Sequence, residues 1–292
     1  MRYLWLVSLL WAFSFGLIKG RLGGLDSVGV AVIRLSLAAL VFLPWLRWRA
    51  LPNRLALRLV VIGTVQFGLM YVFYLKAFAH LAAYEVAMFT VFTPLYVALM
   101  DSAVEQRVNR RGLLAAAIAV VGAAALKWDR GISVDGMIGF LLVQGSNLSF
   151  AAGQLAYRRL RQTNAAMQGR SDASLFALPY LGAAVAVGLF SIIATDWAAF
   201  APTSSQWNAL IYLGIIASGI GFFGWNYGAS RASAGALAVA NNIVVPLAVL
   251  VALVVFGETA DPLRLTLSGA LIGLALLLAE WPFGRGKTAP VA

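Results

Sequence analysis

The residues best suited to chemistry in this sequence are polar side chains set inside long apolar stretches. Arg34 lies well within one such stretch, and Glu85 lies near the start of another. If these stretches cross a membrane, Arg34 either anchors a substrate carboxylate, or snorkels to the interface or binds carbonyl groups of a neighbouring helix. Glu85 is either a proton-carrying carboxylate or a first-turn acid favoured by the helix dipole. Both pairs of alternatives stay open from the sequence.

Amide and aromatic side chains form a second set of candidates. Asn241 and Asn242 are adjacent, so on a helix they point about 100° apart and at least one of them faces protein or water rather than lipid. Such amides either bind a zwitterionic ligand without a charge cost or hold helices together. Aromatic side chains around a central cavity would suit an apolar ligand. The full predicted binding set is Trp11, Phe15, Arg34, Tyr74, Tyr84, Glu85, Met88, Asn147, Trp225, Asn226, Asn241 and Asn242.

Two prolines lie inside apolar stretches, at Pro94 and Pro246. Each removes a backbone hydrogen bond and is expected to kink its helix and free a carbonyl at mid-depth. The kinks are either gating levers or static bends.

The composition removes several kinds of chemistry. Without cysteine there are no disulfides, thiolate nucleophiles or thiolate metal ligands, and a single histidine excludes a site with several histidines. An intramembrane enzyme, which needs a nucleophile with a base or a metal cluster, is therefore a remote alternative. We predict no catalytic residue, no metal and no cofactor. No phosphate-binding loop of the Walker type occurs, so we do not expect ATP to supply energy.

The elements that must position these residues are membrane-spanning helices. The chain has 292 residues, of which 62% are hydrophobic and 11% are charged, with a mean hydropathy of +0.86. A soluble domain is roughly a quarter charged. Hydropathy predicts an all-α integral membrane protein with ten spans, each end uncertain by a few residues. They cover residues 3–19, 28–46, 57–76, 83–101, 111–127, 136–157, 173–194, 206–228, 234–256 and 264–282.

The charge distribution predicts an orientation. With the N-terminus in the cytoplasm, fifteen of the 22 Lys and Arg residues fall in cytoplasmic segments and six in outer ones, with Arg34 inside a span. The positive-inside rule then predicts a multi-pass protein of the bacterial inner membrane with both termini cytoplasmic. It assigns the net charge of +11 to the lipid surface, so lipid is an expected partner and nucleic acid is not. We read the first stretch as a retained span rather than a signal peptide, because no cleavage pattern follows it.

The chain resembles itself. Residues 74–98 contain a small-residue turn and an apolar helix with Pro94, followed by Glu105; residues 226–250 repeat this with Pro246 and Glu258. We therefore predict two repeats, 1–131 and 132–292. Five spans per repeat is an odd number, so the second copy must have inverted topology. Inverted repeats are typical of secondary transporters, which bind substrate near the bilayer midplane.

Several motifs also resemble one family. The run from Ile33 to Leu40 is similar to the arginine-bearing second span of the EamA branch of the drug/metabolite transporter superfamily. The segments around Pro94 and Pro246 resemble its fourth and ninth spans, and Leu213 to Gly228 resembles its eighth. The resemblance covers the whole chain and implies the ten-span EamA fold and transport of small metabolites.

These observations predict a secondary transporter. We expect export of amino acids, aromatic or otherwise apolar, or of similar metabolites, by alternating access; the aromatic amino-acid exporters of the superfamily are the expected kin. The alternatives are a polyspecific drug exporter and an importer of a vitamin or another metabolite. We expect a monomer whose partners are its small-molecule substrate and membrane lipid.

Overall fold

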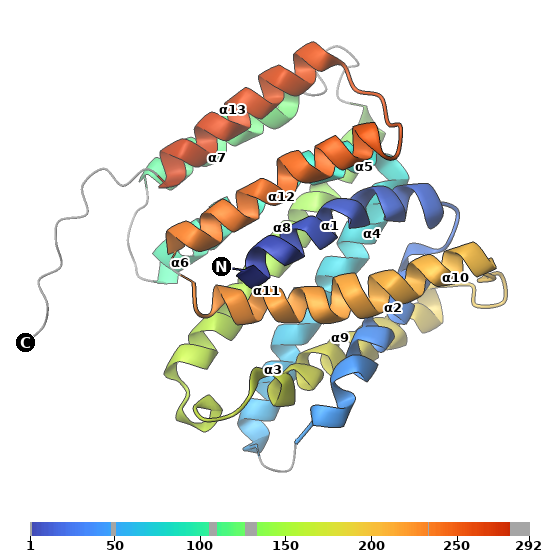
Figure 1. Cartoon of the computed structure of the whole chain (residues 1–292), viewed down its shortest axis with the longest axis vertical. Helices are drawn as coiled ribbons and strands as arrows, with labels where there is room; N and C mark the ends of the chain where they lie inside the picture. The colour runs from blue at the N-terminus through green and yellow to red at the C-terminus, as the bar shows by residue number, and fades with distance from the viewer. Residues whose placement is uncertain (1, 48–50, 105–109, 126–132, 233, 281–292) are drawn as a thin grey trace, which may run out of the picture.

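The computed structural model describes residues 2–47, 51–104, 110–125, 133–232 and 234–280. Within these ranges every regular element is helical, as the sequence predicts (Figure 1). Some side chains inside the helices are not described, namely those of residues 2, 104, 111–113, 116, 234–239, 241, 242, 276, 279 and 280. Glu105, which the repeat predicts as the counterpart of Glu258, lies outside the described residues.

Each predicted span corresponds to one helix or to a run of consecutive helical pieces. In chain order these are α1 (Arg2–Arg21), α2 (Ser27–Phe42), η1 (Leu43–Trp45), α3 (Asn53–Gly63), η3 (Thr64–Leu69), α4 (Met70–His80), α5 (Ala83–Phe89), α6 (Phe92–Val104), α7 (Arg110–Ala125), α8 (Val134–Thr163), η4 (Ala165–Met167), α9 (Asp172–Ala194), α10 (Ser204–Ile211), η5 (Tyr212–Ile220), α11 (Gly221–Ala229), α12 (Ala234–Val254) and α13 (Pro262–Glu280).

Six of these runs are long and apolar enough to cross a membrane in the described part of the chain. They are Tyr3–Arg21, Ser27–Trp45, Asn53–His80, Ala83–Ala103, Asp172–Ala194 and Ser204–Ala229. Helix α8 is long but carries Gln144, Asn147 and Gln154 among its apolar residues. The count of ten spans therefore stays a prediction.

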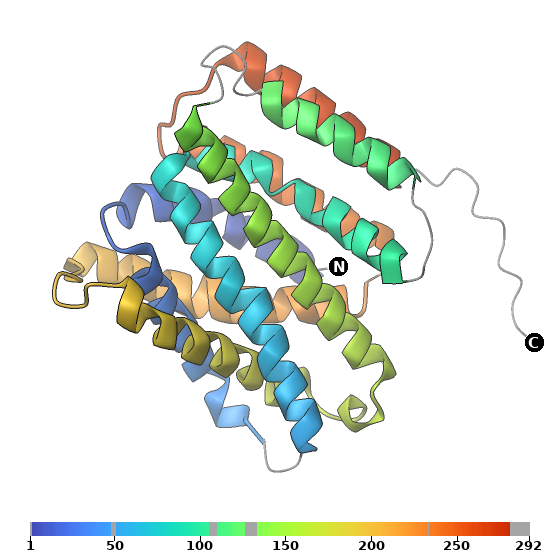
Figure 2. The ribbon, with the colours of Figure 1, turned by 180° about the vertical axis from the view of Figure 1, so that it is seen from behind.

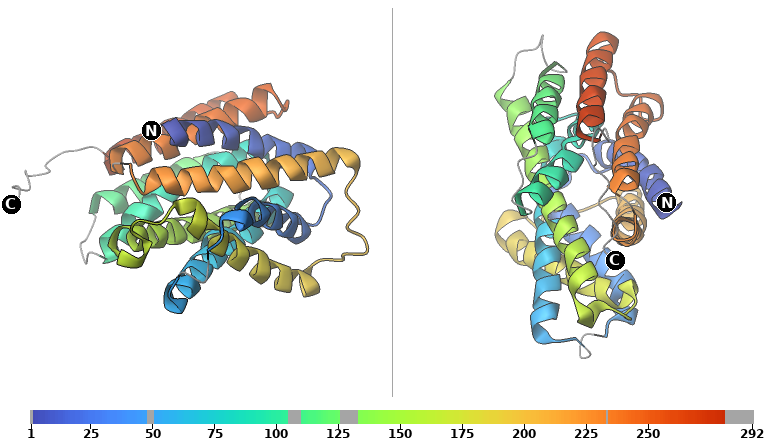
Figure 3. Two further views of the ribbon diagram at one scale, coloured as in Figure 1. Left: turned by 60° about the horizontal axis from the view of Figure 1, so that its bottom comes forward. Right: turned by 90° about the vertical axis from the view of Figure 1, so that its left-hand side faces the viewer.

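The helices pack in pairs that recur when the two halves of the chain are exchanged. Helix α1 packs against α12, and α8, the counterpart of α1, packs against α6, which belongs to the counterpart of α12. In the same way α4 packs against α8, and α11, the counterpart of α4, packs against α1. Helices α2 and α9 pack against each other, as do α7 and α13. Figure 1 shows α7 beside α13 at the top of the bundle, and Figure 2 shows α4 beside α8 from behind. The right-hand view of Figure 3 keeps α7 and α13 at one edge. The same pattern of pairs therefore results when the first half of the chain is exchanged for the second.

Two π-helical segments interrupt the runs at corresponding places in the halves. Segment η3 separates α3 from α4, and η5 separates α10 from α11. Inside η5 the Ser218 hydroxyl donates to the carbonyl of Leu213, five residues back, at 2.6 Å. Hydropathy does not predict these segments. They matter because π-helical turns inside α-helices are frequent at functional sites.

The two prolines behave differently. The chain breaks its helix at residues 90 and 91, between α5 and α6, shortly before Pro94. The break follows from the missing N–H of the proline and the clash of its ring with the preceding turn. Helix α12 instead continues through Pro246 without interruption. A break therefore accompanies the proline in the first half only.

Candidate functional site

A cavity in the centre of the bundle collects residues from both halves of the chain. Its volume is about 110 Å³. A ligand of drug size needs a pocket of roughly 300–1,000 Å³, so this cavity is smaller than such a ligand requires. Its lining is mostly apolar with a few polar groups: Trp11, Ser14, Phe15, Arg34, Met70, Tyr71, Tyr74, Thr90, Thr93, Ser146, Asn147, Phe150, Phe222 and Val244.

Arg34 supplies the charge of the cavity. Helix α2 places it at 2% exposure, so it does not snorkel to the surface. Its Nη2 donates to the Tyr71 hydroxyl at 2.9 Å and to Ser218 Oγ at 3.1 Å, and its Nε donates to Ser218 Oγ at 3.2 Å. The Tyr71 hydroxyl and Ser218 Oγ are in turn 2.6 Å apart. Two hydroxyl groups thus hold one edge of the guanidinium.

The other edge of the guanidinium is unsatisfied. Arg34 Nη1 is buried and has no hydrogen-bond partner among the described atoms. No carboxylate of the described residues forms an ion pair with Arg34, and none lines the cavity. A buried charge without a counter-charge is costly, and a buried donor without an acceptor adds to that cost. An anionic group that accepts hydrogen bonds would neutralise the guanidinium and satisfy Nη1.

Aromatic rings form the walls around this charge. Phe15 and Tyr74 pack edge to face with their ring centroids 5.8 Å apart. Trp11 contacts Phe222 at 4.8 Å and Phe150 at 6.2 Å, and its Nε1 donates to the carbonyl of Ala217 at 3.0 Å. These rings come from α1, α4, α8 and α11, so the two halves share the walls. The enclosed surface suits an apolar ring or chain attached to an anionic group.

Asn147 and two threonines provide polar groups at the break between α5 and α6. Asn147 Nδ2 donates to the carbonyl of Phe89, the last residue of α5, at 2.8 Å. Asn147 Oδ1 accepts from Thr93 Oγ1 at 3.1 Å. Thr90 lines the cavity at the break itself and donates to the carbonyl of Ala87 at 2.6 Å. Asn147 thus ties α8 to a carbonyl that the broken helix leaves free.

The structure separates the predicted binding residues into three groups. Five line the cavity: Trp11, Phe15, Arg34, Tyr74 and Asn147. Five lie outside its lining: Tyr84, Glu85, Met88, Trp225 and Asn226. The side chains of Asn241 and Asn242 lie outside the described part of the chain.

Local contacts explain why several candidates do not reach the cavity. Glu85 turns back to accept from the backbone N–H of Ala82 at 3.0 Å, at the start of α5. Trp225 is fully buried and donates from Nε1 to Gln154 Oε1 at 3.1 Å. Asn226 accepts from Gln66 Nε2 at 3.0 Å. The bond of Glu85 completes a helix end, and the bonds of Trp225 and Asn226 cross between helices.

Tyr71 and Ser218, which hold Arg34, are not among the residues predicted from the sequence. A tyrosine and a serine inside apolar stretches carry no signal of their own, because both are common in membrane helices as packing residues. Only the fold shows that Ser218, 184 residues from Arg34, lies beside the guanidinium. An arginine inside an apolar stretch needs polar partners in other apolar stretches, and this need is the signal that could have led to Tyr71 in the same half and Ser218 in the opposite half.

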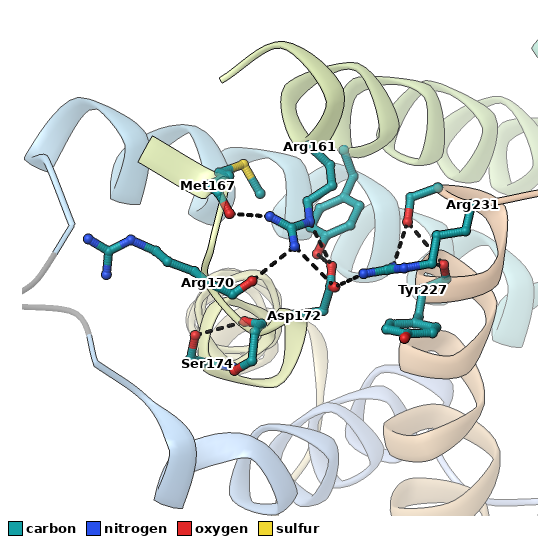
Figure 4. Close-up of polar contacts among 10 residues, drawn as sticks. Arg161, Met167, Arg170, Asp172, Ser174, Tyr227 and Arg231 are labelled. Carbon is teal, nitrogen blue, oxygen red and sulfur yellow. Dashed lines mark hydrogen bonds and ion pairs between the residues drawn. The ribbon is translucent and has the colours of Figure 1, made fainter. Parts of the chain in front are cut away.

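A second charged cluster lies away from the cavity, at the junction of α8, α9 and α11 (Figure 4). The side chain of Asp172, in the first turn of α9, is 2% exposed. It pairs with Arg161 at 3.2 Å and with Arg231 at 2.8 Å, and it accepts from the Tyr157 hydroxyl at 2.9 Å. Arg161 also donates to the backbone carbonyls of Met167 and Arg170. Because all charges in this cluster are partnered, it acts as a structural joint.

The chain is similar to a known family of transporters and to several of its members. The model of the EamA-like transporter family matches residues 2–127 and 137–280. The probable biotin transporter of Pseudomonas aeruginosa is 40% identical over 278 residues, covering 94% of this chain and 96% of that protein. The biotin transporter of Salmonella typhimurium is 40% identical over 299 residues, covering 99% and 94%.

Two other similar proteins are more distant. A probable terminal-alkyne amino-acid exporter of Streptantibioticus cattleyicolor is 36% identical over 81 residues, which is 27% of either chain. A crystal structure of another protein, 19% identical, matches with a TM-score of 0.68 over 95% of both chains. At that identity the match shows a common fold and nothing about the ligand.

Proposed function

Because this chain belongs to the EamA-like transporter family, we propose that it carries a small apolar monocarboxylate, and that biotin is its substrate. The chain is a membrane transporter of the drug/metabolite superfamily, as the resemblance predicted. The choice of substrate is the proposal, and it rests on the chemistry of the central cavity.

The charge balance of the cavity carries the proposal. Arg34 is the only charged residue among the described lining residues, and its Nη1 has no partner there. Biotin has one carboxylate and no ammonium group, so it would neutralise this cavity. An amino acid would bring an ammonium group as well, and no described lining residue offers it a carboxylate. Burying that second charge without a partner would cost binding free energy.

The remaining lining residues suit the remainder of the molecule. The aliphatic chain and the sulfur-containing ring of biotin are apolar, and Trp11, Phe15, Tyr74 and Phe222 supply an apolar surface. Its ureido group offers two N–H donors and one carbonyl acceptor. Asn147 is the one amide among the described lining residues, and its Oδ1 can accept a bond from a ureido N–H in addition to the one from Thr93, whereas its Nδ2 already donates to the carbonyl of Phe89 and to Gln144 Oε1. Threonine and serine hydroxyls lie beside it in the lining.

Transport then requires the central cavity to open. We propose that the two halves are inverted repeats of five spans, which rock against each other about the cavity, and that the break before Pro94 allows part of this motion. In this scheme the chain spans the bacterial inner membrane ten times as a monomer, with both termini in the cytoplasm. No ATP is consumed, and the direction of net flux follows the substrate gradient.

Counterflow in proteoliposomes tests the proposed substrate. Vesicles loaded with unlabelled biotin and diluted into radiolabelled biotin should accumulate label, whereas empty vesicles of the same lipid should not. Unlabelled biotin should compete, and biotinamide, which lacks the carboxylate, should compete far less. If loaded and empty vesicles accumulate the same label, biotin is not the substrate.

Export of an amino acid is the second candidate. The partial similarity to an amino-acid exporter and the aromatic walls of the cavity favour it. The two candidates separate in the same assay: vesicles loaded with phenylalanine or leucine, rather than biotin, would then drive uptake of the matching label. This candidate is second because the described lining residues include no carboxylate for the ammonium group.

A further inference from the structure

A second cavity lies beside the first, at the end of α1. Its volume is about 270 Å³, and its lining comes from the end of α1, the turn that follows, the start of α2 and the end of α4. Lys19 is the only charged residue among its described lining residues. The cavity is larger than the central one and, unlike it, adjoins a chain turn, which places it toward one end of the bundle.

The two cavities are stacked along the same three helices. On α1, Phe15 lines the central cavity and Lys19, one turn later, lines the second. On α2, Arg34 lines the central cavity and Val30, one turn earlier, lines the second. On α4 the corresponding pair is Tyr74 and Phe78. One helical turn rises about 5.4 Å, so the cavities are neighbours along one path.

Aromatic rings form the boundary between the cavities. Tyr74 packs edge to face against Phe78 with ring centroids 5.1 Å apart, and against Phe15 at 5.8 Å. Rotation of the Tyr74 ring would open a way from one cavity to the other. The ring of Tyr74 therefore separates a ligand in the second cavity from Arg34.

Lys19 gives the second cavity a positive charge, and no carboxylate in the described part of the chain forms an ion pair with it. Its ammonium donates to the backbone carbonyl of Phe78 at 2.7 Å, which leaves two of its three N–H donors for a ligand. Asp26, an acid in the adjacent turn, is directed elsewhere: its Oδ1 accepts from the Thr195 hydroxyl at 2.6 Å and from the N–H of Gly29 at 2.8 Å. Arg21, also nearby in sequence, donates to Ser205 and adds a second positive charge to this end of α1.

We propose that this second cavity is a carboxylate-binding vestibule, in which Lys19 holds the substrate carboxylate before it passes Tyr74 to Arg34. The inference rests on the proposed function, since it takes a monocarboxylate as the cargo. It assigns Lys19 a role in capture: the substrate carboxylate first pairs with Lys19 on α1 and then with Arg34 on α2.

Transport kinetics test the role of Lys19. In proteoliposomes, Lys19→Gln should raise the KM for biotin about three- to tenfold with kcat nearly unchanged. Added salt should reduce this difference in KM between the wild type and the variant. Lys19→Arg should restore most of the wild-type KM. Lys76→Gln is the matched control, because Lys76 is an exposed lysine on α4 that lines neither cavity. A KM for Lys19→Gln within twofold of that for Lys76→Gln overturns the inference.

Chemical protection tests the site without transport. The detergent-solubilised protein is acetylated with an amine-reactive ester, and mass spectrometry compares Lys19 with Lys76 as the internal reference. Biotin and hexanoate, but not biotinamide, should slow acetylation of Lys19, and they should do so equally in Arg34→Gln. Equal acetylation of Lys19 with and without these carboxylates overturns the vestibule. If wild-type vesicles carry no biotin, the proposed function fails, and protection by hexanoate still decides whether the vestibule binds carboxylates.

Discussion

The carboxylate of Glu258 caps the helix that begins at Ala83. Its Oε1 accepts from the backbone N–H of Ala83 and its Oε2 from that of Tyr84, each at 2.9 Å. Glu258 follows α12 in the second half of the chain, whereas α5 belongs to the first. An acidic side chain at a helix N-terminus satisfies free N–H groups and interacts favourably with the helix dipole. This contact therefore joins the two halves at one end of the bundle.

We expect Glu258→Ala to loosen this junction. The substitution leaves two N–H groups at the start of α5 without their acceptor, a loss of about 1–2 kcal/mol. If the junction closes access to the cavity, the open population should rise by roughly 5- to 30-fold. Since the chain has no cysteine, the variant Thr90→Cys provides a single reporter in the cavity lining. Its labelling by a hydrophilic maleimide should become faster by that factor in Glu258→Ala.

Asp261→Ala is the control for this experiment. Asp261 lies three residues further along the same loop and accepts from the N–H of Arg264, within its own half. Its loss should leave the labelling rate unchanged. Equal acceleration by both variants would mean that the loop as a whole, and not the bond to α5, controls access.

The sequence predicted the helices well because hydropathy depends on local composition. The segments around α1, α2, α9 and the run from α3 to α4 are each apolar enough to show their limits without knowledge of their neighbours. Arg34 is a candidate binding residue on similarly local grounds, because a charge in an apolar stretch is conspicuous. The resemblance to the EamA family, which the family match shows, likewise rests on local motifs.

The features that depend on contacts between distant segments could not be predicted. Gly63 approaches α9, and Ser218 turns toward Arg34, only because the halves pack as they do. The π-helical segments lie at these contacts and have no compositional signal. Glu85 is as conspicuous in the sequence as Arg34, but its carboxylate accepts from the N–H of Ala82 at the start of α5 and does not line the cavity.

Arg34→Gln should abolish the preference for a carboxylate. A hydrogen bond to a charged group contributes about 1.5–3 kcal/mol, so the KM for biotin should rise at least tenfold. The weak competition by biotinamide should hardly change, because that compound has no carboxylate to lose. Competition curves for the two compounds against labelled biotin measure the effect. A variant that still prefers the acid to the amide by the wild-type factor would show that Arg34 does not bind the carboxylate.

Ser218→Ala should weaken binding through Arg34. Ser218 Oγ accepts two bonds from the guanidinium, so its removal frees the edge that orients Arg34 Nη1. We expect the KM for biotin to rise about tenfold with kcat nearly unchanged, as for loss of one or two hydrogen bonds. In the double variant with Arg34→Gln the serine effect should vanish, because both changes remove the same interaction.

Ser14→Ala provides the matched control for Ser218. Ser14 also lines the cavity, but its hydroxyl donates to the carbonyl of Leu10 in its own helix, at 2.9 Å. Its substitution should leave the KM near the wild-type value. Additive effects of Ser218→Ala and Arg34→Gln would show that Ser218 acts on the helix η5 rather than on the arginine.

Asp172→Asn should destabilise the junction of α8, α9 and α11. The buried carboxylate balances Arg161 and Arg231, and breaking a buried ion pair typically costs 3–5 kcal/mol, reduced here because Arg231 is 44% exposed. We expect a lower midpoint of thermal unfolding in detergent. Asp101→Asn is the comparison, since Asp101 pairs with Arg159 at 2.6 Å but is 49% exposed. It should shift the midpoint much less, and an equal shift would contradict the structural role given to Asp172.

Gly63→Ala should prevent the packing of α3 against α9. A Cβ added at Gly63 would lie 1.9 Å from the carbonyl oxygen of Pro179 and 2.2 Å from its Cα, and both atoms are backbone that no rotamer change can move. The helices must separate to accept the methyl group, which costs 1–3 kcal/mol or more when a core is overpacked. Gly188→Ala is the control, because Gly188 lies in α9, the helix of Pro179, and a Cβ there meets nothing within 4 Å. Size-exclusion profiles and thermal unfolding should show a strongly destabilised Gly63→Ala beside an unaffected or slightly more stable Gly188→Ala, since alanine is the better helix former. A Gly63→Ala protein as stable as the wild type would mean that α3 and α9 do not meet at this glycine.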